Sequence, residues 1–204
     1  NKVEMGKGRS AGIEFMAQKT AGKTTGWLSY TLSKSDRKFT KGGINNGEWF
    51  PYKYDRRHSI NLTINHKFSD RIDIGASWVF YTGGTSTIPE EKTTVIRPHN
   101  GANNGFLWYG TYDNTNSSPT IGDVSYIEHR NNFRLPASHR LNLGVNFNKK
   151  TKHGMRTWNI SLYNAYNAMN PAWVYRGHNK QGLSVIKKYT LLPLIPSFTY
   201  TYKF

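Results

Sequence analysis

The amino-acid sequence predicts an all-β fold, an antiparallel transmembrane β-barrel, and three observations support this prediction. Seven segments alternate between apolar and polar side chains, which is the pattern of strands with two different faces. The connections between these segments are alternately short and long. No run approaches the roughly 18 apolar residues that a spanning helix needs, whereas a spanning strand needs only about ten alternating residues.

The first four alternating segments are separated by tight connections in two places. A turn with Gly22 and Gly26 lies between the first and the second, and the connection 69–71 lies between the third and the fourth. Because so short a connection joins strands of a hairpin, we expect the third and fourth segments to pair. The apolar positions of the four are Ala11, Ile13, Phe15 and Ala17; Leu28, Tyr30 and Leu32; Ile60, Leu62, Ile64, His66 and Phe68; and Ile72, Ile74, Ala76, Trp78 and Phe80.

The last three segments show the same alternation, and no stretch shows comparable helical periodicity. Charges within the seven segments all fall on polar positions: Glu14, Lys67, Asp73, Arg140 and Lys203. The apolar positions of the last three are Leu141, Leu143, Val145 and Phe147; Trp158, Ile160 and Leu162; and Phe198, Tyr200, Tyr202 and Phe204.

Two of the segments echo each other in sequence. Residues 58–65, HSINLTIN, resemble residues 139–146, HRLNLGVN, and both follow a long connection. Repetition of one architecture explains this echo, and chance similarity between two amphipathic strands explains it about as well.

The lengths of the connections separate a barrel from a soluble β-sandwich, which would show the same alternation. Short connections lie at about 20–26, 69–71 and 149–156, and long ones at about 36–57, 83–136 and 170–188. Outer-membrane barrels have short periplasmic turns and long extracellular loops. A connection as long as 83–136 is also unusual inside a compact soluble domain. We therefore expect 83–136 to be extracellular and the short turns to be periplasmic.

The number of strands predicts that the barrel is larger than this chain. Seven is odd, whereas single-chain bacterial barrels have an even number of strands. Seven strands would also leave unpaired edges, which lipid does not tolerate. We therefore expect further strands upstream of Asn1.

Composition narrows the function classes. Aromatic residues make up 14% of a chain whose mean hydropathy is only −0.69, a combination that few soluble cores have. The net charge of +16 invites a nucleic-acid interpretation, but no nucleic-acid module is visible, and much of the excess lies in the short connections. The absence of cysteine excludes disulfides and thiolate catalysis. We expect no nucleic-acid partner.

Enzymatic chemistry is not predicted. No acidic residue follows Glu128, so the last 76 residues cannot supply a carboxylate pair or a Ser-His-Asp set. The seven histidines show no spacing that suggests a metal site, and we expect neither metal nor cofactor. The charged cluster 55–58, DRRH, is interpreted as structural rather than as a ligand clamp or an acid/base set. Its charges, at the outer end of a strand, are expected to pair with neighbouring strands or with lipopolysaccharide phosphates.

Several stretches resemble one protein family. The ending 196–204, PSFTYTYKF, resembles the terminal strand of TonB-dependent outer-membrane receptors, with an aromatic last residue like the signal that the barrel assembly machinery reads. The stretches 8–14 (GRSAGIE), 26–33 (GWLSYTLS), 54–58 (YDRRH) and 163–167 (YNAYN) are similar to the same family in Bacteroidetes-like bacteria. The resemblance covers nearly the whole chain.

This resemblance implies a fold, a function and a location. Family barrels have 22 strands around an N-terminal plug, so residues 1–204 would be the C-terminal portion with the last seven strands. The implied function is TonB-energised uptake of a scarce nutrient, such as an iron chelate, cobalamin, a glycan or a peptide, by an integral protein of the bacterial outer membrane. The alternatives are a passive or structural outer-membrane barrel without energy coupling and a soluble β-sandwich binding module, with nucleic acid as one candidate ligand.

The resemblance also implies partners. They are outer-membrane lipid and lipopolysaccharide, the TonB complex through the missing N-terminal part, the barrel assembly machinery and, as in related systems, a surface lipoprotein. We expect the four terminal aromatics Phe198, Tyr200, Tyr202 and Phe204 to form the barrel-assembly signal.

Aromatic residues in two long connections are candidates for stacking on a ligand that enters from outside. Mutual packing within the loops or anchoring at the membrane explains them equally well. The candidates are Trp49, Phe50, Tyr52, Phe106, Trp108, Tyr109 and Tyr112.

The parity of the strands predicts which side chains share a face. We expect the following residues to contact lipid: Ile60, Leu62, Ile64, Ile74, Trp78, Leu143, Val145, Ile160 and Leu162. We expect these to face the lumen: Asn61, Asp73, Asn142 and Asn159.

Overall fold

The computed structural model describes residues 5–97 and 120–204. The chain divides into two units, one of residues 1–88 with 129–204 and one of residues 89–128. Every strand pairing in the described residues is antiparallel, and the one helical element among them is the short 3-10 turn Ile44–Gly47. The prediction of an all-β antiparallel fold is confirmed.

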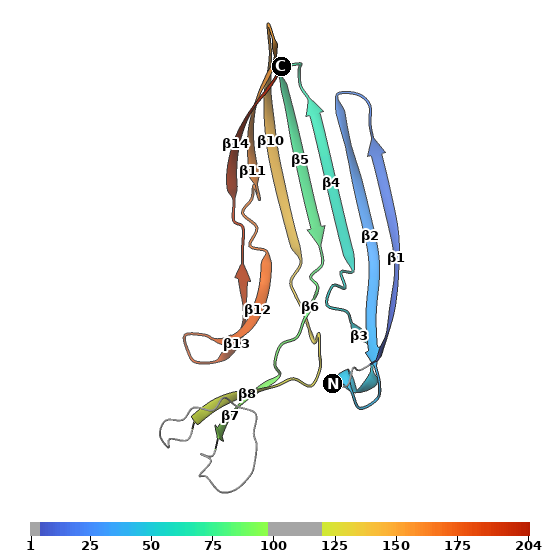
Figure 1. The fold of residues 1–204 in the computed structure, drawn as a ribbon, viewed down its shortest axis with the longest axis vertical. Helices are drawn as coiled ribbons and strands as arrows, with labels where there is room; N and C mark the ends of the chain where they lie inside the picture. The colour runs from blue at the N-terminus through green and yellow to red at the C-terminus, as the bar shows by residue number, and fades with distance from the viewer. Residues whose placement is uncertain (1–4, 98–119) are drawn as a thin grey trace. The chain divides into compact units, whose positions relative to one another are not determined.

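The first unit contains one large sheet in which each long strand pairs with the next long strand along the chain (Figure 1). A short strand, β3 (Phe50–Pro51), extends the sheet beside the second of them. All seven predicted segments lie in these long strands, and the predicted hairpin between the third and fourth segments is present. The long strands are β1 (Gly6–Lys19), β2 (Thr24–Phe39), β4 (His58–Lys67), β5 (Ile72–Tyr81), β10 (Ser138–Thr151), β11 (Gly154–Tyr163) and β14 (Ile195–Lys203).

In the described part of the chain this sheet is open. The strands β1 and β14 are its two edges, and each pairs with a neighbour on one side. A strand at an edge presents a row of backbone N–H and C=O groups that can pair with another strand.

The connections between the long strands alternate as the sequence predicts. The short ones, 20–23, 68–71 and 152–153, lie at one end of the sheet, which we call the turn end, near the label C in Figure 1. The long ones, 40–57, 82–137 and 164–194, leave from the opposite end, which we call the loop end. Because consecutive long strands are antiparallel neighbours, successive connections lie at alternate ends of the sheet.

One predicted connection is wrong in its bounds. The stretch 149–156 was expected to be a turn, but β10 and β11 continue through most of it, and Lys149 pairs with Arg156. The apolar alternation stops among the lysines of this stretch, so the sequence pattern did not indicate strands there. The two strands nevertheless remain paired through their backbones. Only 152–153 lie between the two strands.

The long connections contain short strands that the apolar alternation did not predict. In the first unit, β6 (Thr85–Ser86) pairs with β9 (Phe133–Arg134), and β12 (Pro171–His178) pairs with β13 (Ser184–Thr190). The rings of Trp173 and Tyr189 stack across the second pair with centroids 4.3 Å apart. The second unit is a hairpin of β7 (Glu91–Arg97) and β8 (Thr120–Tyr126).

Candidate functional site

One face of the large sheet is apolar from strand to strand. The register aligns Ile74 of β5, Val145 of β10, Ile160 of β11 and Phe198 of β14 in one row. The neighbouring rows follow the same parity, so the nine residues predicted to share a face do share it, and we call it the apolar face. This face carries no Lys, Arg, Asp or Glu in the middle of its strands, from Leu28 to Leu32 of β2, Ile60 to His66 of β4, Ile72 to Phe80 of β5, Leu141 to Phe147 of β10, Trp158 to Leu162 of β11 and Phe198 to Tyr202 of β14. Lys149 and Arg156 lie on the same face at the turn end.

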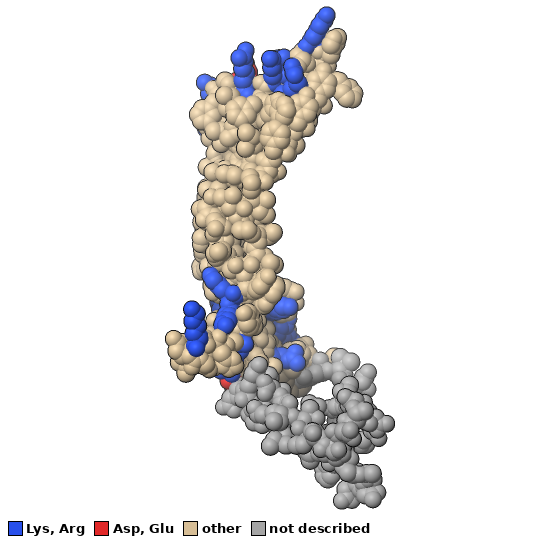
Figure 2. All heavy atoms as spheres, turned by 90° about the vertical axis from the view of Figure 1, so that its left-hand side faces the viewer, with Lys and Arg blue, Asp and Glu red and all other residues tan. Residues whose placement is uncertain are grey.

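The apolar face lies at the surface of the described structure. Among residues 5–90 and 126–204, whose side chains are described, the buried apolar residues are Phe50 and Ile88, and neither belongs to this face. Ile160 is 50% exposed and Phe198 is 63% exposed. Lysine and arginine side chains gather toward the two ends of the sheet and leave an uncharged band between them (Figure 2). A sandwich, in which a second sheet would bury this face, is not seen in the described residues.

The opposite face, which we call the polar face, carries a hydrogen-bonded network across three strands. The two carboxylate oxygens of Asp73 accept from the side-chain amides of Asn146 (2.6 Å) and Asn148 (2.7 Å). Asn159 donates to Asn146 and Thr157 donates to Asn148, each at 2.7 Å. The residues predicted for the polar side, Asn61, Asp73, Asn142 and Asn159, all lie on this face.

Arg140 also lies on the polar face. Its guanidinium sits 4.3 Å from the centroid of the Tyr163 ring, and its Nη1 donates to the Tyr163 hydroxyl. Its Nε is buried and has no hydrogen-bond partner among the described residues. A buried donor without a partner is uncommon, so this face has an unmet hydrogen-bonding requirement at Arg140.

The two echoing segments place their histidines in equivalent environments. His58 begins β4, and its Nδ1 lies 2.9 Å from the hydroxyl of Tyr30. His139, the second residue of β10, has its Nδ1 2.8 Å from the hydroxyl of Tyr166, which also accepts from the indole N–H of Trp78 at 3.1 Å. Both pairs lie at the loop end of the apolar face, and each joins an aromatic ring to a polar group.

The charged cluster 55–58 forms structural contacts, as the sequence interpretation expected. The side chain of Asp55 is fully buried and accepts from the backbone N–H of Ser35 (2.6 Å), from Arg57 Nε (2.9 Å) and from Arg134 Nη2 (2.6 Å). Arg134 Nη1 also donates to the backbone carbonyls of Asp55 and Gly83, each at 2.9 Å. The contact joins β2 to the first two long connections of the first unit.

Hydrogen bonding controls the ionisation of Asp55. Burial raises the pKa of this carboxyl, but the hydrogen bonds from Arg134, Ser35 and Arg57 outweigh burial and hold the pKa below its usual range. At the turn end, the exposed carboxyl of Asp70 also has a lowered pKa because Lys67 Nζ lies 3.0 Å away.

The predicted ligand-stacking aromatics are placed unequally. Phe50 is buried and stacks on Phe39 with centroids 6.0 Å apart. Tyr52 lies under the guanidinium of Arg37 and meets Tyr54 edge to face. Trp49 is 39% exposed. The described part of this group therefore packs mainly against β1 and β2, since the guanidinium of Arg9 also lies over the Trp49 ring. A ligand-binding role stays a prediction. The candidates Phe106, Trp108, Tyr109 and Tyr112 lie outside the described residues.

The four terminal aromatics share the apolar face, as predicted. Phe198 pairs with Ile160 and Tyr200 pairs with Trp158, while the ring of Trp158 contacts both aromatic rings at centroid distances of 5.1 and 4.5 Å. Phe204 is fully exposed at the end of the edge strand. Their role in barrel assembly stays a prediction.

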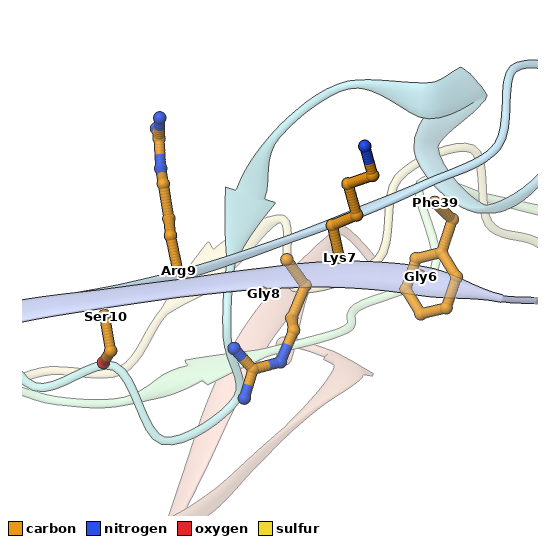
Figure 3. A pocket seen from close by; sticks show the side chains of 7 residues that line it. Gly6, Lys7, Gly8, Arg9, Ser10 and Phe39 are labelled. Atoms are coloured by element: carbon orange, nitrogen blue, oxygen red, sulfur yellow. The ribbon is translucent and has the colours of Figure 1, made fainter.

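An open pocket of about 480 Å³ lies at the loop end of β1 and β2 (Figure 3). Two glycines make room for the side chains that line it. A Cβ on Gly6 would lie 2.8 Å from the ring of Phe39, and a Cβ on Gly8 would lie 2.5 Å from Arg37 Nη1. Gly8 begins the stretch 8–14 in which the sequence resemblance was found, and Gly6 lies two residues before it.

Sequence reasoning missed several buried polar residues that organise the loops. Asn164 is fully buried and has a φ of 54°, in the left-handed region. Its side-chain amide donates to the carbonyls of Ala168 (3.0 Å) and Leu192 (3.1 Å). Asn45 exchanges two hydrogen bonds with the backbone of Arg130, at 2.7 and 3.1 Å. Asparagine tolerates left-handed backbone and caps loops, which is the signal that could have identified them.

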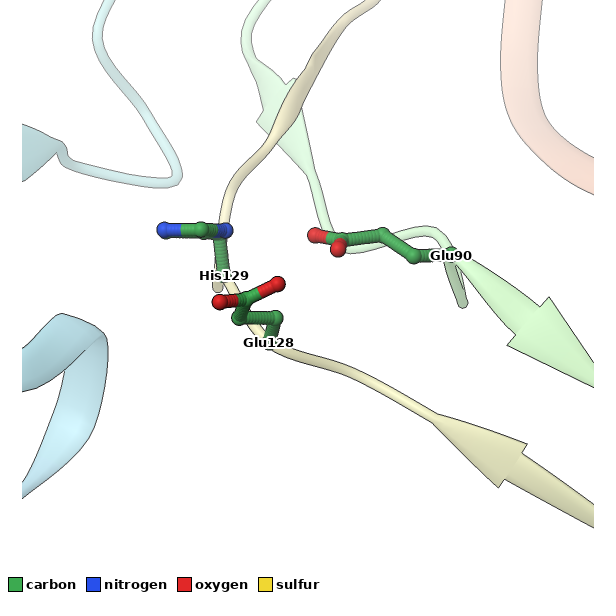
Figure 4. A group of neighbouring side chains, drawn as sticks. All are labelled: Glu90, Glu128 and His129. Atoms are coloured by element: carbon green, nitrogen blue, oxygen red, sulfur yellow. The ribbon is translucent and has the colours of Figure 1, made fainter.

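Two carboxylates lie at the base of the hairpin in the second unit (Figure 4). Glu90 precedes β7 and Glu128 follows β8, and their carboxylate oxygens lie within 4.8 Å of each other. The backbone N–H of Glu90 donates to the carbonyl of Tyr126 at 2.9 Å, which closes the base of the hairpin. His129 is the next residue along the chain. Because a hard cation such as Ca²⁺ takes six or more oxygen ligands, two carboxylates alone do not form a metal site.

In the part of the chain that the structure describes, no helix is long and apolar enough to cross a membrane. Comparisons with protein-family models, curated proteins and solved structures find no match for this chain.

Proposed function

We propose that the large sheet is part of a transmembrane β-barrel in a bacterial outer membrane and that the protein is a TonB-dependent receptor that imports a scarce nutrient. The observation that carries the proposal is the exposed apolar face, with its uncharged central band, opposite a hydrogen-bonded polar face. Contiguous apolar surface of this extent is rare on a soluble protein. Lipid on the apolar side and a water-filled or plugged lumen on the polar side would satisfy both faces.

The height of the apolar band supports a membrane span. In β10, ten residue steps separate His139 at the loop end from Lys149 at the turn end. At about 3.3 Å per residue and a strand tilt of about 40°, this stretch rises by about 25 Å. The apolar band of outer-membrane barrels has about this height.

The residues at the two ends of the band support the same proposal. The hydrogen-bonded pairs of Tyr30 with His58 and Tyr166 with His139 lie at the loop end. Trp158 and Tyr200 lie toward the turn end, with Tyr202 beyond them. Rings that combine an apolar body with a polar tip are favoured at membrane interfaces, where they form girdles around barrels.

The edges of the sheet support a barrel with more strands. In lipid, the backbone groups at the edges of β1 and β14 would need partners, so further strands must pair with them. In a family barrel of 22 strands these would be the last seven, and a plug would lie against the polar face.

Energy coupling and the nutrient rest on the sequence resemblance alone. The candidate nutrients are iron chelates, cobalamin, glycans and peptides, and the candidate contacts are the loop aromatics named above. A passive or structural barrel is the second proposal, because the same two-faced sheet would serve it equally well.

Uptake by cells tests the proposal and separates the alternatives. Cells lacking the gene and cells carrying it in full length would be compared for uptake of labelled nutrients from each class, with and without a protonophore. We expect one class to be taken up only with the gene and only without the protonophore. Uptake that persists with the protonophore would support a passive barrel, and a protein that purifies without detergent would refute both barrels.

A further inference from the structure

Four cationic side chains share the apolar face at the loop end of β1 and β2. Lys7, Arg9, Lys34 and Lys38 have the same parity in the register as Ile13 and Leu32. Figure 3 shows Lys7 and Arg9 projecting from one side of β1 and Ser10 from the other. These cations therefore stand beside the apolar band on the face that we propose meets lipid. We call them the cation cluster.

A buried carboxylate and a tryptophan hold the centre of this cluster in place. Arg9 donates to Asp36 from Nε (3.0 Å) and from Nη2 (2.9 Å), and Lys34 Nζ lies 3.5 Å from the same carboxylate. The guanidinium of Arg9 also lies 4.3 Å from the ring centroid of Trp49. Asp36 is 4% exposed, whereas the side chains of Arg9 and Lys34 remain more than half exposed.

Among the residues that the structure describes, the groups beside the cluster do not balance its charge. Four cations surround one carboxylate, which leaves a net charge of about +3 on this part of the face. In the adjoining connection, the charge of Glu48 is offset by that of Lys41. A cationic patch of this kind attracts anions, and fixed guanidinium groups bind phosphate oxygens through charge-assisted hydrogen bonds.

Apolar side chains adjoin the cluster directly. Ile13 pairs with Leu32, two residues along the strands from the pair of Ala11 and Lys34. The side chain of Ile13 is 74% exposed and that of Leu32 is 41% exposed. Phe15 follows on the same face and is 56% exposed. A ligand with anionic groups beside hydrocarbon chains would match both parts of this surface, whereas free phosphate would use only the first.

We propose that the cation cluster binds the phosphate groups of lipopolysaccharide, with the acyl chains along Ile13, Phe15 and Leu32. This inference rests on the proposed function, which puts the loop end at the cell surface, where lipopolysaccharide forms the outer leaflet. Arg9 is the central contact because Asp36 and Trp49 already order its side chain, so less conformational entropy is lost on binding.

Binding of purified lipid A to the full-length protein in phosphatidylcholine nanodiscs tests this inference. The main variant is Lys7→Gln/Lys38→Gln, which leaves the Arg9–Asp36 pair intact and so keeps the fold. A second variant, Arg9→Gln/Asp36→Asn, removes the central contact without leaving Asp36 as an unpaired buried charge. The matched control is Lys149→Gln/Arg156→Gln, which removes two cations from the apolar face at the turn end.

We expect Lys7→Gln/Lys38→Gln, which removes two cations, to weaken lipid A binding about tenfold or more, since a cation near an anionic surface contributes about fivefold. Arg9→Gln/Asp36→Asn leaves the net charge of the cluster unchanged, so we expect it to weaken binding less, through loss of the ordered guanidinium donors. The control should bind like the unmodified protein, and lipid A stripped of its phosphates should bind weakly to all. Equal binding by the cluster variants and the control would overturn the inference. Displacement of lipid A by millimolar inorganic phosphate would also overturn it, because the site would then be one for free phosphate.

A separate readout distinguishes failure of this inference from failure of the proposed function. Insertion into the nanodiscs, followed as heat-modifiable migration of the folded protein, reports whether the protein is a membrane barrel. Insertion of all variants without any effect of the cluster on lipid A binding would refute the inference alone. Failure of the unmodified protein to insert would refute the proposed function and this inference with it.

Discussion

Asp55 and Arg134 are 79 residues apart in the chain, yet their side chains lie 2.6 Å apart at the loop end of the sheet. The same arginine donates to the backbone of Asp55 and Gly83, so a single side chain joins the connection after β3 to that after β5. Because Asp55 is buried, protonation or replacement of its carboxylate removes the charge pairing of this contact.

Acid should release this contact. Because the pKa of Asp55 is lowered in the folded protein, its contribution to stability is fully present above the usual range of aspartate and is lost as pH falls through the folded pKa. We expect cleavage by pepsin in the connections 40–57 and 82–137 to be slow near pH 5 and to rise below about pH 4. After cleavage is normalised to that of an unfolded substrate at each pH, an equal rise in Asp55→Asn would show that another group is responsible. At neutral pH, Asp55→Asn should cost about 2–3 kcal/mol of loop stability, since two arginines lose a charged acceptor.

Arginine substitutions on neighbouring residues should separate the two faces of β4. Ile64 lies on the apolar face and Thr63 on the polar face, one residue apart at the same depth. Ile64→Arg should lower the free energy of unfolding from liposomes by about 2–4 kcal/mol, because the charge would enter lipid, and Val145→Arg should do the same. The control Thr63→Arg should cost much less. Similar losses for Ile64→Arg and Thr63→Arg in urea titrations would contradict the assignment of faces.

The two ends of the sheet should be accessible from opposite sides of the outer membrane. Protease added to intact cells should cut within the connection 82–137, which leaves from the loop end. Sites in 68–71 and 152–153 should become accessible only after the outer membrane is opened. Cleavage of the turn end in intact cells, with the connection 82–137 protected, would reverse the proposed topology.

Deletion of Phe204 should impair assembly more than packing predicts. Its ring is fully exposed at the end of β14, so its loss removes no buried contact in the described structure. If the terminal aromatics are read by the assembly machinery, the level of folded, heat-modifiable barrel in the outer membrane should fall severalfold. Unchanged levels would mean that Phe204 is simply the last residue of a strand, where removal frays one end.

Side-chain alternation predicted the strands of the large sheet because each has two chemically different faces. The runs in β4 and β10 show this most clearly, since residues from Ile60 to Ile64 and from Leu141 to Phe147 alternate without a break. The same reasoning failed where the pattern stops but backbone pairing continues, as between Lys149 and Arg156. It also missed the hairpin of β12 and β13, because Trp173, Val174 and Tyr175 follow one another in β12 without an intervening polar residue.

The loop contacts could not be predicted because they depend on tertiary proximity. Nothing in the local sequence joins Asp55 to Arg134 or Asn45 to Arg130, which are 79 and 85 residues apart. Phe50 was a candidate for ligand stacking because it lies beside Trp49 in a connection, but it is buried against Phe39. Composition identified the aromatic cluster of this loop, and only the fold shows which of its rings are exposed.

Single-cysteine labelling at Val145 and Asn146 tests the central claim most directly, because this chain has no cysteine of its own. The two residues are adjacent in β10 and lie on opposite faces. In the full-length protein in liposomes, we predict that a spin label at Val145→Cys collides mainly with oxygen, which dissolves in lipid. A label at Asn146→Cys should collide mainly with a water-soluble nickel complex or be shielded by the plug. Equal access of the nickel complex to both labels would contradict the proposal that the apolar face meets the membrane.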